Sequence, residues 1–290
     1  MTFGVSSMTA PLRKVALKRP GRSLLNADRA KWHYGPLFDP TKVEKIHQSF
    51  ADILTNSGAE ILWLPEDDSG IADSVFAYDA SLMTPKGAIL MSPGKVLRQG
   101  EQDLHRTFYR DHHIPVIGEI TGNARAEAGD TLWLDDQTLI IGRGFRTNPE
   151  GVAQLRAICD QIGITTHVFD LPVYQGAKAC LHLMSLISLV DTKTALVCMP
   201  LLPVGFLDLL LAKGFTLIKA PFDEFGSSGT LSTNVLALSP GHCVMIDGLP
   251  KTQEALTTAG VQLDLFDGAA LCIGCEGGPT CLTRPILRGV

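Results

Sequence analysis

Apolar and polar residues follow a pattern that recurs four times along the chain. In each copy, two short apolar segments separated by turn residues come before an amphipathic helical stretch, and a third apolar segment follows it. Glycine often closes the helical stretch. The pattern therefore predicts ββαβ units, each with a hairpin ahead of its helix. The four predicted units cover residues 74–120, 126–171, 180–220 and 232–267.

The two ends of the chain supply the parts of a fifth unit. Residues 279–288 and 14–20 form two predicted strands, and residues 39–58 and 59–64 follow as a helix and a strand. Pairing of the first and last strands would close a cyclic repeat and remove exposed sheet edges. We therefore expect a five-bladed α/β propeller in a single domain, residues 1–290. The alternative is a doubly wound α/β sheet, which does not need a hairpin before every helix.

Composition narrows the class of protein. The chain has 290 residues, a net charge of −5 and 45% hydrophobic residues, which favours neither nucleic acid nor an anionic membrane as a partner. Its most apolar stretch, residues 199–218, is interrupted by Pro203, Asp208 and Lys213, so no membrane span is expected. Seven cysteines and a start without an apolar signal segment predict a cytoplasmic protein with free thiols.

Polar residues recur at matching points, near the start of the first strand of each predicted unit. These residues are Asp79, Glu127, His182, Asn234 and, in the closing unit, Cys281. Taken singly, each has a structural explanation as a capping residue, a core histidine or a buried thiol. If the first strands point to a common axis, however, they converge on one pocket. A thiol nucleophile, an imidazole proton carrier and two cation-binding carboxylates would form a catalytic set there.

Three cysteines gather near the C-terminal end: Cys272, Cys275 and Cys281. A zinc site needs more ligands than a single C-x-x-C pair supplies, and the other obvious candidates are only His242 and Cys243. A redox role for Cys272 and Cys275 is the second alternative. We expect neither metal nor cofactor, and we interpret Cys272 and Cys275 as bystanders.

Five segments together resemble a known enzyme family. "DSVFAYDAS", "AEAGD", "RGFRTNPEG", "CLHLMS" and "EGGPTCL" occur in this order over most of the chain. They are similar to the guanidino-group-modifying superfamily of dimethylargininases, arginine deiminases and amidinotransferases. That superfamily has the five-bladed ββαβ propeller known as the pentein fold, so the resemblance and the repeat imply the same architecture.

The resemblance implies roles for four residues at the reacting group. Cys281 would attack the guanidinium carbon, and His182 would protonate the departing amine and then activate water. Asp79 and Glu127 would hold the guanidinium nitrogens. These roles suit the chemistry, because a delocalised guanidinium is a poor electrophile and has to be fixed in line with a thiolate.

The resemblance also implies contacts at the other end of the substrate. Arg98 and Arg146 would bind an α-carboxylate, for which the planar fork of arginine is suited, and Asp73 would bind an α-ammonium group. Residues 18–36 are placed like the lid of dimethylargininases. The expected partner is thus a small guanidino compound, and a homodimer remains open.

One position separates the members of the superfamily. Arginine deiminases carry an aspartate two residues after the histidine, whereas this chain has Met184. The resemblance then implies a hydrolase of the dimethylargininase type, which converts an Nω-methylated arginine to citrulline and an alkylamine. The alternatives are a deiminase of arginine or another guanidino compound, an amidinotransferase, and a propeller that binds a guanidino ligand or a protein without turnover.

Overall fold

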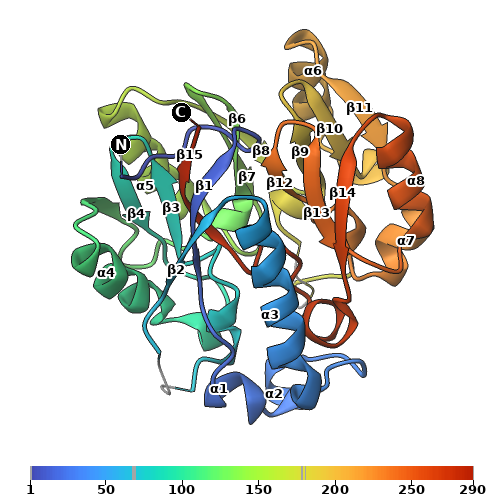
Figure 1. Ribbon diagram of the computed structural model, residues 1–290. Coiled ribbons are helices and arrows are strands. Elements are labelled where there is room, and N and C mark those ends of the chain that lie inside the picture. The colour runs from blue at the N-terminus through green and yellow to red at the C-terminus, as the bar shows by residue number, and fades with distance from the viewer. Residues whose placement is uncertain (1, 67–69, 178, 180, 290) are drawn as a thin grey trace.

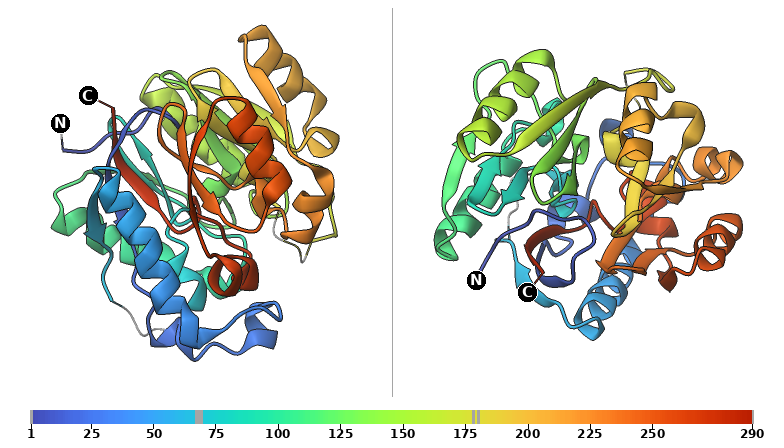
Figure 2. Two further views of the ribbon diagram at one scale, coloured as in Figure 1. Left: turned by 45° about the vertical axis from the view of Figure 1, so that its right-hand side comes forward. Right: turned by 90° about the horizontal axis from the view of Figure 1, so that it is seen from above.

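The computed structural model describes residues 2–289 apart from residues 67–69, 178 and 180. Its strands form five three-stranded sheets (Figure 1). In each sheet the middle strand pairs antiparallel with one neighbour and parallel with the other. Seen from above, the sheets follow one another around the molecule in chain order (Figure 2). This is the repeated α/β propeller architecture that the sequence predicts.

Four of the sheets are built from consecutive ββαβ units, each with a helix between its second and third strands. The first unit contains β3 (Ser81–Thr84), β4 (Gly87–Leu90), α4 (Glu101–Asp111) and β5 (Val116–Glu119). The second contains β6 (Thr131–Asp135), β7 (Thr138–Arg143), α5 (Pro149–Gln161) and β8 (Thr165–Asp170). The third contains β9 (Ile187–Asp191), β10 (Thr194–Val197), α6 (Val204–Ala212) and β11 (Thr216–Lys219). The fourth follows α7 (Phe222–Ser227) and contains β12 (Leu236–Ser239), β13 (His242–Ile246), α8 (Pro250–Thr258) and β14 (Gln262–Phe266).

The fifth sheet joins the two ends of the chain. β15 (Arg284–Arg288) pairs antiparallel with β1 (Leu12–Leu17), which pairs parallel with β2 (Glu60–Trp63). The predicted pairing of the first and last strands is therefore confirmed. Two short helices, α1 (Arg22–Leu25) and α2 (Arg29–Trp32), lie between β1 and the helix of this unit.

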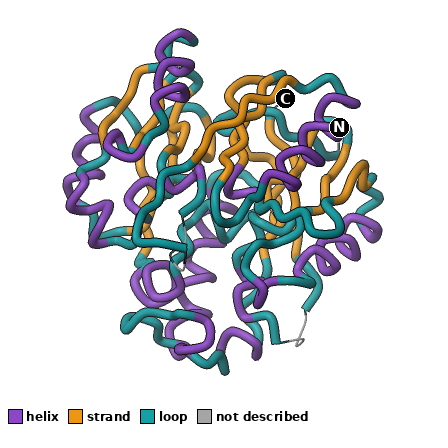
Figure 3. Tube along the Cα trace, turned by 180° about the vertical axis from the view of Figure 1, so that it is seen from behind, coloured by secondary structure: helices purple, strands orange, loops and turns teal. Residues whose placement is uncertain are grey.

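That helix, α3 (Pro40–Asn56), shows how the local sequence sets an element. The Asp39 side chain accepts a hydrogen bond from the Thr41 backbone N–H, and Pro40 occupies the first turn, where its missing N–H costs nothing. Val43, Phe50 and Leu54 are completely buried on one face. The helices lie outside the strands (Figure 3), and among the described residues no helix is both long enough and apolar enough to cross a membrane.

The first strands of the units are shorter than the sequence predicts. Short 3-10 helices precede them in the chain, at Ala72–Val75, Ala128–Asp130, Leu183–Ser185 and Leu231–Thr233. An apolar run predicts burial, and the buried residues of these tight turns continue the run of the strand. The consequence is functional, because the candidate site residues lie in or beside the turns rather than on the strands.

Candidate active site

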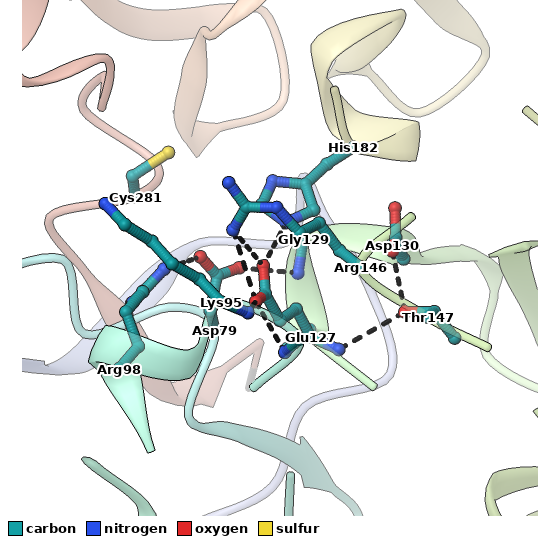
Figure 4. A network of polar contacts seen from close by, with 12 residues as sticks. Asp79, Lys95, Arg98, Glu127, Gly129, Asp130, Arg146, Thr147, His182 and Cys281 are labelled. Atoms are coloured by element: carbon teal, nitrogen blue, oxygen red, sulfur yellow. Dashed lines mark hydrogen bonds and ion pairs between the residues drawn. The ribbon is translucent and has the colours of Figure 1, made fainter. Parts of the chain in front are cut away.

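One pocket receives residues from all five units. The loops ahead of their first strands bring Asp79, His182, Asn234 and Cys281 to its wall, and Arg146 reaches it from the loop ahead of α5. Of the seven predicted site residues, six line this pocket. The seventh, Glu127, is completely buried and bonded to two of them (Figure 4).

Glu127 is the centre of a hydrogen-bond network. Its Oε2 lies 2.6 Å from His182 Nε2 and 3.1 Å from an Arg146 NH1 donor. Its Oε1 accepts from the backbone N–H groups of Gly94 and Lys95 at 2.9 and 3.2 Å. Burial would raise the pKa of Glu127, but Arg146 and His182 outweigh burial and lower it. Glu127 is thus ionised, and His182 Nε2 donates a proton to this hydrogen bond.

Asp130 connects the turn at residues 128–130 with the turn that begins at Leu183, next to His182. Its carboxylate accepts from the Leu183 backbone N–H at 2.9 Å and from the Thr147 hydroxyl at 2.6 Å. Burial raises the pKa of Asp130 to about 6. Gly129, in the same turn, lies so close to the imidazole that a Cβ added to it would be 2.8 Å from His182 Cγ. The turn at residues 128–130 therefore fixes where the imidazole can lie.

Asp79 forms an ion pair with Arg98, whose guanidinium group has further hydrogen-bond partners. Arg98 NH1 lies 2.5 Å from Asp79 Oδ2, and its Nε and NH2 each donate to Glu101 at 2.8 Å. NH2 also donates to the Phe76 carbonyl at 3.0 Å. Burial would lower the pKa of Arg98, but Glu101 and Asp79 outweigh burial and raise it. Four of the five N–H groups of a guanidinium are thereby used, so Arg98 lacks a free fork for a substrate carboxylate.

Asp73 also has partners in this structure. Its Oδ1 accepts from the Tyr34 hydroxyl at 2.7 Å, and its Oδ2 lies 2.6 Å from Lys95 Nζ. Lys95 Nζ further donates to the Trp32 carbonyl at 3.2 Å and lies 5.2 Å from the centre of the Trp32 ring. Trp32 and Tyr34 belong to the segment 18–36, which therefore contacts the pocket. A lysine ammonium occupies the contact that we expected for a substrate ammonium.

Cys281 is the partly exposed cysteine of the described set. Its Sγ lies 3.1 Å from Asn234 Nδ2, and the Asn234 side-chain oxygen accepts from the Thr280 backbone N–H at 2.9 Å. Cys272 and Cys275 are buried, and burial raises the pKa of both thiols. Burial of this kind disfavours the reactive thiolate, so of these three cysteines Cys281 has the surroundings of a nucleophile.

Ligand atoms of Asp79, Glu127 and His182 all lie within 4.8 Å of one another, close enough to share a metal ion. Each carboxylate, however, is already paired with a cationic side chain, Asp79 with Arg98 and Glu127 with Arg146. The donor set suits a planar cation with N–H groups at least as well as a metal. The expectation that no metal is bound stays a prediction.

Comparisons with known proteins show what this chain is similar to. The family model described as arginine deiminase matches residues 71–204, which contain every predicted site residue except Cys281. A dimethylarginine dimethylaminohydrolase of Pseudomonas aeruginosa is 25% identical over 275 residues, covering 93% of this chain and 98% of its own.

Solved structures have the same fold. A mutant of the Pseudomonas aeruginosa enzyme in complex with citrulline superposes with a TM-score of 0.77 at 24% identity, covering 94% of this chain and 98% of its own. SxtG, an amidinotransferase of Microseira wollei, gives a TM-score of 0.77 at 14% identity, covering 99% and 98%. The family model and the dimethylarginine dimethylaminohydrolase relatives support the guanidino-group-modifying superfamily. Within this superfamily its relatives include dimethylarginine dimethylaminohydrolases over nearly the whole length.

Sequence reasoning did not find every residue that shapes the pocket. Lys95, Glu101, Asp130 and Thr147 were given no role, and Asn234 was noted only for its position in the repeat. Asp130 lies within the quoted "AEAGD" and Thr147 within "RGFRTNPEG", so the motifs contained a signal for them. No motif contained a signal for Lys95, because only the fold brings its partner Asp73 to it.

Proposed function

We propose that this chain is a hydrolase that cleaves a C–N bond in the guanidino group of an Nω-methylated arginine, with residues 1–290 as one catalytic domain. One observation carries the proposal: Cys281, His182 and the carboxylates of Asp79 and Glu127 gather at one pocket. The Pseudomonas aeruginosa relative is named for action on dimethylarginine, and the structure of its mutant contains citrulline. Both facts support a substrate and a product of this chemical type.

The charge of the pocket favours a guanidinium cation. Asp73, Asp79 and Glu127 are buried carboxylates, and a carboxylate binds a guanidinium by charge-assisted hydrogen bonds. We assign Asp79 to the guanidinium nitrogens, whereas Glu127 already accepts from His182, Arg146 and two backbone N–H groups and contributes its negative charge. Arg98 and Glu101 hold Asp79 in place, so Arg98 contributes at most one N–H to a substrate carboxylate and Arg146 is the stronger candidate for that contact.

The reaction follows from these positions. The Cys281 thiolate attacks the guanidinium carbon and forms a C–S bond, and the tetrahedral adduct collapses as His182 gives a proton to the departing alkylamine. Water then attacks the S-alkylthiouronium intermediate while His182 accepts a proton from the water. Breakage of the C–S bond releases citrulline and restores the thiolate. Glu127 keeps the imidazole oriented in both steps.

Met184 supports a methylated substrate over arginine. It lines the pocket two residues after His182, where an arginine deiminase has a carboxylate. An unmodified guanidinium buried there would lack one partner, at a cost of roughly 1–3 kcal/mol. A methylated guanidinium has fewer N–H donors, and the flexible thioether packs against its methyl groups. We therefore expect kcat/KM for mono- or dimethylarginine to exceed that for arginine by at least about tenfold.

A substrate panel tests the proposal. Citrulline or the corresponding ureido product is measured from arginine, monomethylarginine, both dimethylarginines, agmatine and short guanidino acids under identical conditions. Faster turnover of arginine than of the methylated forms would favour the deiminase alternative. The match to the arginine deiminase family model is consistent with that alternative. Transfer of the amidino group to an added amine without urea-type product would indicate an amidinotransferase. Binding without turnover would indicate a non-enzymatic propeller.

A further inference from the structure

The last strand carries two buried arginines that pair with no acidic side chain among the described residues. Arg284 and Arg288 stand at the two ends of β15. They are 2% and 7% exposed. Among the described residues, their hydrogen bonds all go to backbone carbonyls: Arg284 NH1 to Ser81 at 2.6 Å, and Arg288 to Ala10 and Ala237 at 2.7 and 2.8 Å. A buried cation without a counter-charge is costly, and carbonyl groups compensate only part of it.

Both arginines line a cavity separate from the catalytic pocket. Its walls come from several units and include Tyr78, Trp133 on β6, and Met184, and Tyr78 and Met184 also line the catalytic pocket. The Arg284 guanidinium carbon lies 3.9 Å from the centre of the Tyr78 ring. None of the described residues that line this cavity is an aspartate or a glutamate. The positive charges of the two arginines are therefore not neutralised by an acidic side chain among the described lining residues.

Several hydrogen-bond donors around the cavity have no partner among the described residues. Arg284 Nε, Trp133 Nε1 and the Thr280 hydroxyl are buried, and none of them bonds to a described residue. Such groups are rare in folded proteins and call for a ligand or water. Burial, together with the smaller effect of the like charge on Arg284, lowers the pKa of Arg288 to about 10. Two like charges and three unpartnered donors thus surround one space.

We propose that this cavity binds one small monovalent anion of the size of chloride. The space is about 20 Å³, enough for one small ion or one to two waters and too little for sulfate or phosphate with their hydration. Apolar side chains such as Leu82, Leu189 and Val235 form much of the wall, which further excludes strongly hydrated oxyanions. N–H and O–H donors of arginine, tryptophan and threonine are suitable ligands for a halide. The argument for this anion site does not rest on the proposed function, although Tyr78, Met184 and Thr280 line both spaces.

Thermal unfolding of the full chain tests the inference. Sodium chloride or bromide replaces sodium gluconate at constant ionic strength, since gluconate is too large for the cavity. We expect Tm to rise in a saturable way by roughly 3–6 °C, because an ion that binds only the folded state stabilises it by mass action. Sulfate at the same ionic strength should give none of the saturable rise. A Tm equal in halide and gluconate would overturn the proposal.

A variant pair locates the effect. Arg288→Met should abolish the halide-dependent shift, whereas Arg143→Met, which alters an exposed ion pair at the end of β7, should keep it. An unchanged halide shift in Arg288→Met would overturn the assignment. If that variant does not fold, crystals of the unaltered protein grown in bromide decide the question. An anomalous peak between Arg284 and Arg288 is expected, and peaks confined to the surface would contradict the site.

Discussion

At the scale of single residues, Cys281 differs from its neighbours in exposure and in contacts. Its thiol is partly exposed and lies beside an amide donor, whereas Cys275 is buried with a raised thiol pKa. Cys281→Ser should reduce turnover of methylarginine by at least about a thousandfold, because a serine hydroxyl is a far weaker nucleophile than a thiolate. Citrulline formation measures the loss, and mass spectrometry of the enzyme quenched during turnover should find the adduct on the Cys281 peptide.

Cys275→Ser is the matched control, since it makes the same change at the wall of the same pocket. It should keep most of the activity. Near-normal turnover by Cys281→Ser, or an adduct on another cysteine, would contradict the assigned nucleophile.

Lys95 is the residue whose removal should improve binding. Its ammonium occupies Asp73, so a substrate ammonium at Asp73 would meet a like charge and has to displace it. Lys95→Met should lower KM for methylarginine by about tenfold and leave kcat nearly unchanged, equivalent to about 1.4 kcal/mol. Lys86→Met, at an exposed turn, serves as the control. A higher KM in Lys95→Met would show that the lysine itself binds the substrate.

At the scale of elements, the 3-10 turn at residues 128–130 positions the imidazole. A Cβ at Gly129 would lie 2.7 Å from Asp79 Oδ1 and 2.8 Å from His182 Cγ, closer than real contacts allow. Gly129→Ala should therefore displace one of these groups and lower kcat/KM by at least about tenfold, since small misplacements cost catalysis heavily. In Gly226→Ala the nearest atom would be 3.8 Å away, and activity should be normal. Equal activity of the two variants would refute this role for the turn.

Asp130, in the same turn, predicts a dependence of stability on pH. Its folded pKa of about 6 lies above the ordinary value of 3.8, so between these pH values the folded state binds more protons than the unfolded state. The contribution of this group to stability is therefore present at low pH and falls by roughly 3 kcal/mol as pH rises through this window. Asp130→Asn, which keeps a hydrogen-bond acceptor for the Leu183 N–H, should remove that decline.

Urea unfolding of both proteins at pH 4.5, 5.5 and 7 measures the difference. The variant should gain stability relative to the unaltered protein as pH rises. An identical pH profile for the two proteins would show that Asp130 titrates normally. Asn148→Ala, which removes the cap of α5 instead, should lower stability equally at all three pH values.

The elements also show where sequence reasoning succeeds and where it ends. Helix α5 is evident from Asn148, Pro149 and its apolar period, and its observed cap is the Asn148 side chain bonded to Gly151 N–H. The turns ahead of the first strands were predicted as strand, and most of their residues are as buried as the strands that follow. A period-two pattern needs more than three or four residues to be distinguished from a tight turn.

At the scale of the whole molecule, the sequence repeat predicted the five sheets, and the family resemblance predicted residues that gather at the pocket. Neither predicted the contact of Lys95 with Asp73, which depends on how loops meet after the sheets have packed. The local ion pair of Arg98 with Glu101, three residues further along the chain, was also not predicted. The sequence did not predict the proposed anion cavity either. Arg284 and Arg288 look like ordinary charged residues of an end strand. Only the fold shows that they are buried and that neither pairs with an acidic side chain of the described residues.

The pairing of β15 with β1 brings the two ends of the described chain together. Gly4 N–H donates to the Ile286 carbonyl at 2.8 Å, and Arg288 N–H donates to the Gly4 carbonyl at 3.1 Å. A circular permutant with these ends joined by a short linker, and new ends at the exposed turn of Asp136 and Gln137, should fold and keep its activity. Loss of folding in that permutant would show that chain order matters to assembly.

If the permutant is active, the order of the motifs is a matter of ancestry rather than of chemistry. A gene opened at another hairpin would encode the same pocket with the cysteine segment ahead of the aspartate segment. Searches that require the motifs in their present order would miss such a relative, whereas a comparison of pockets would find it.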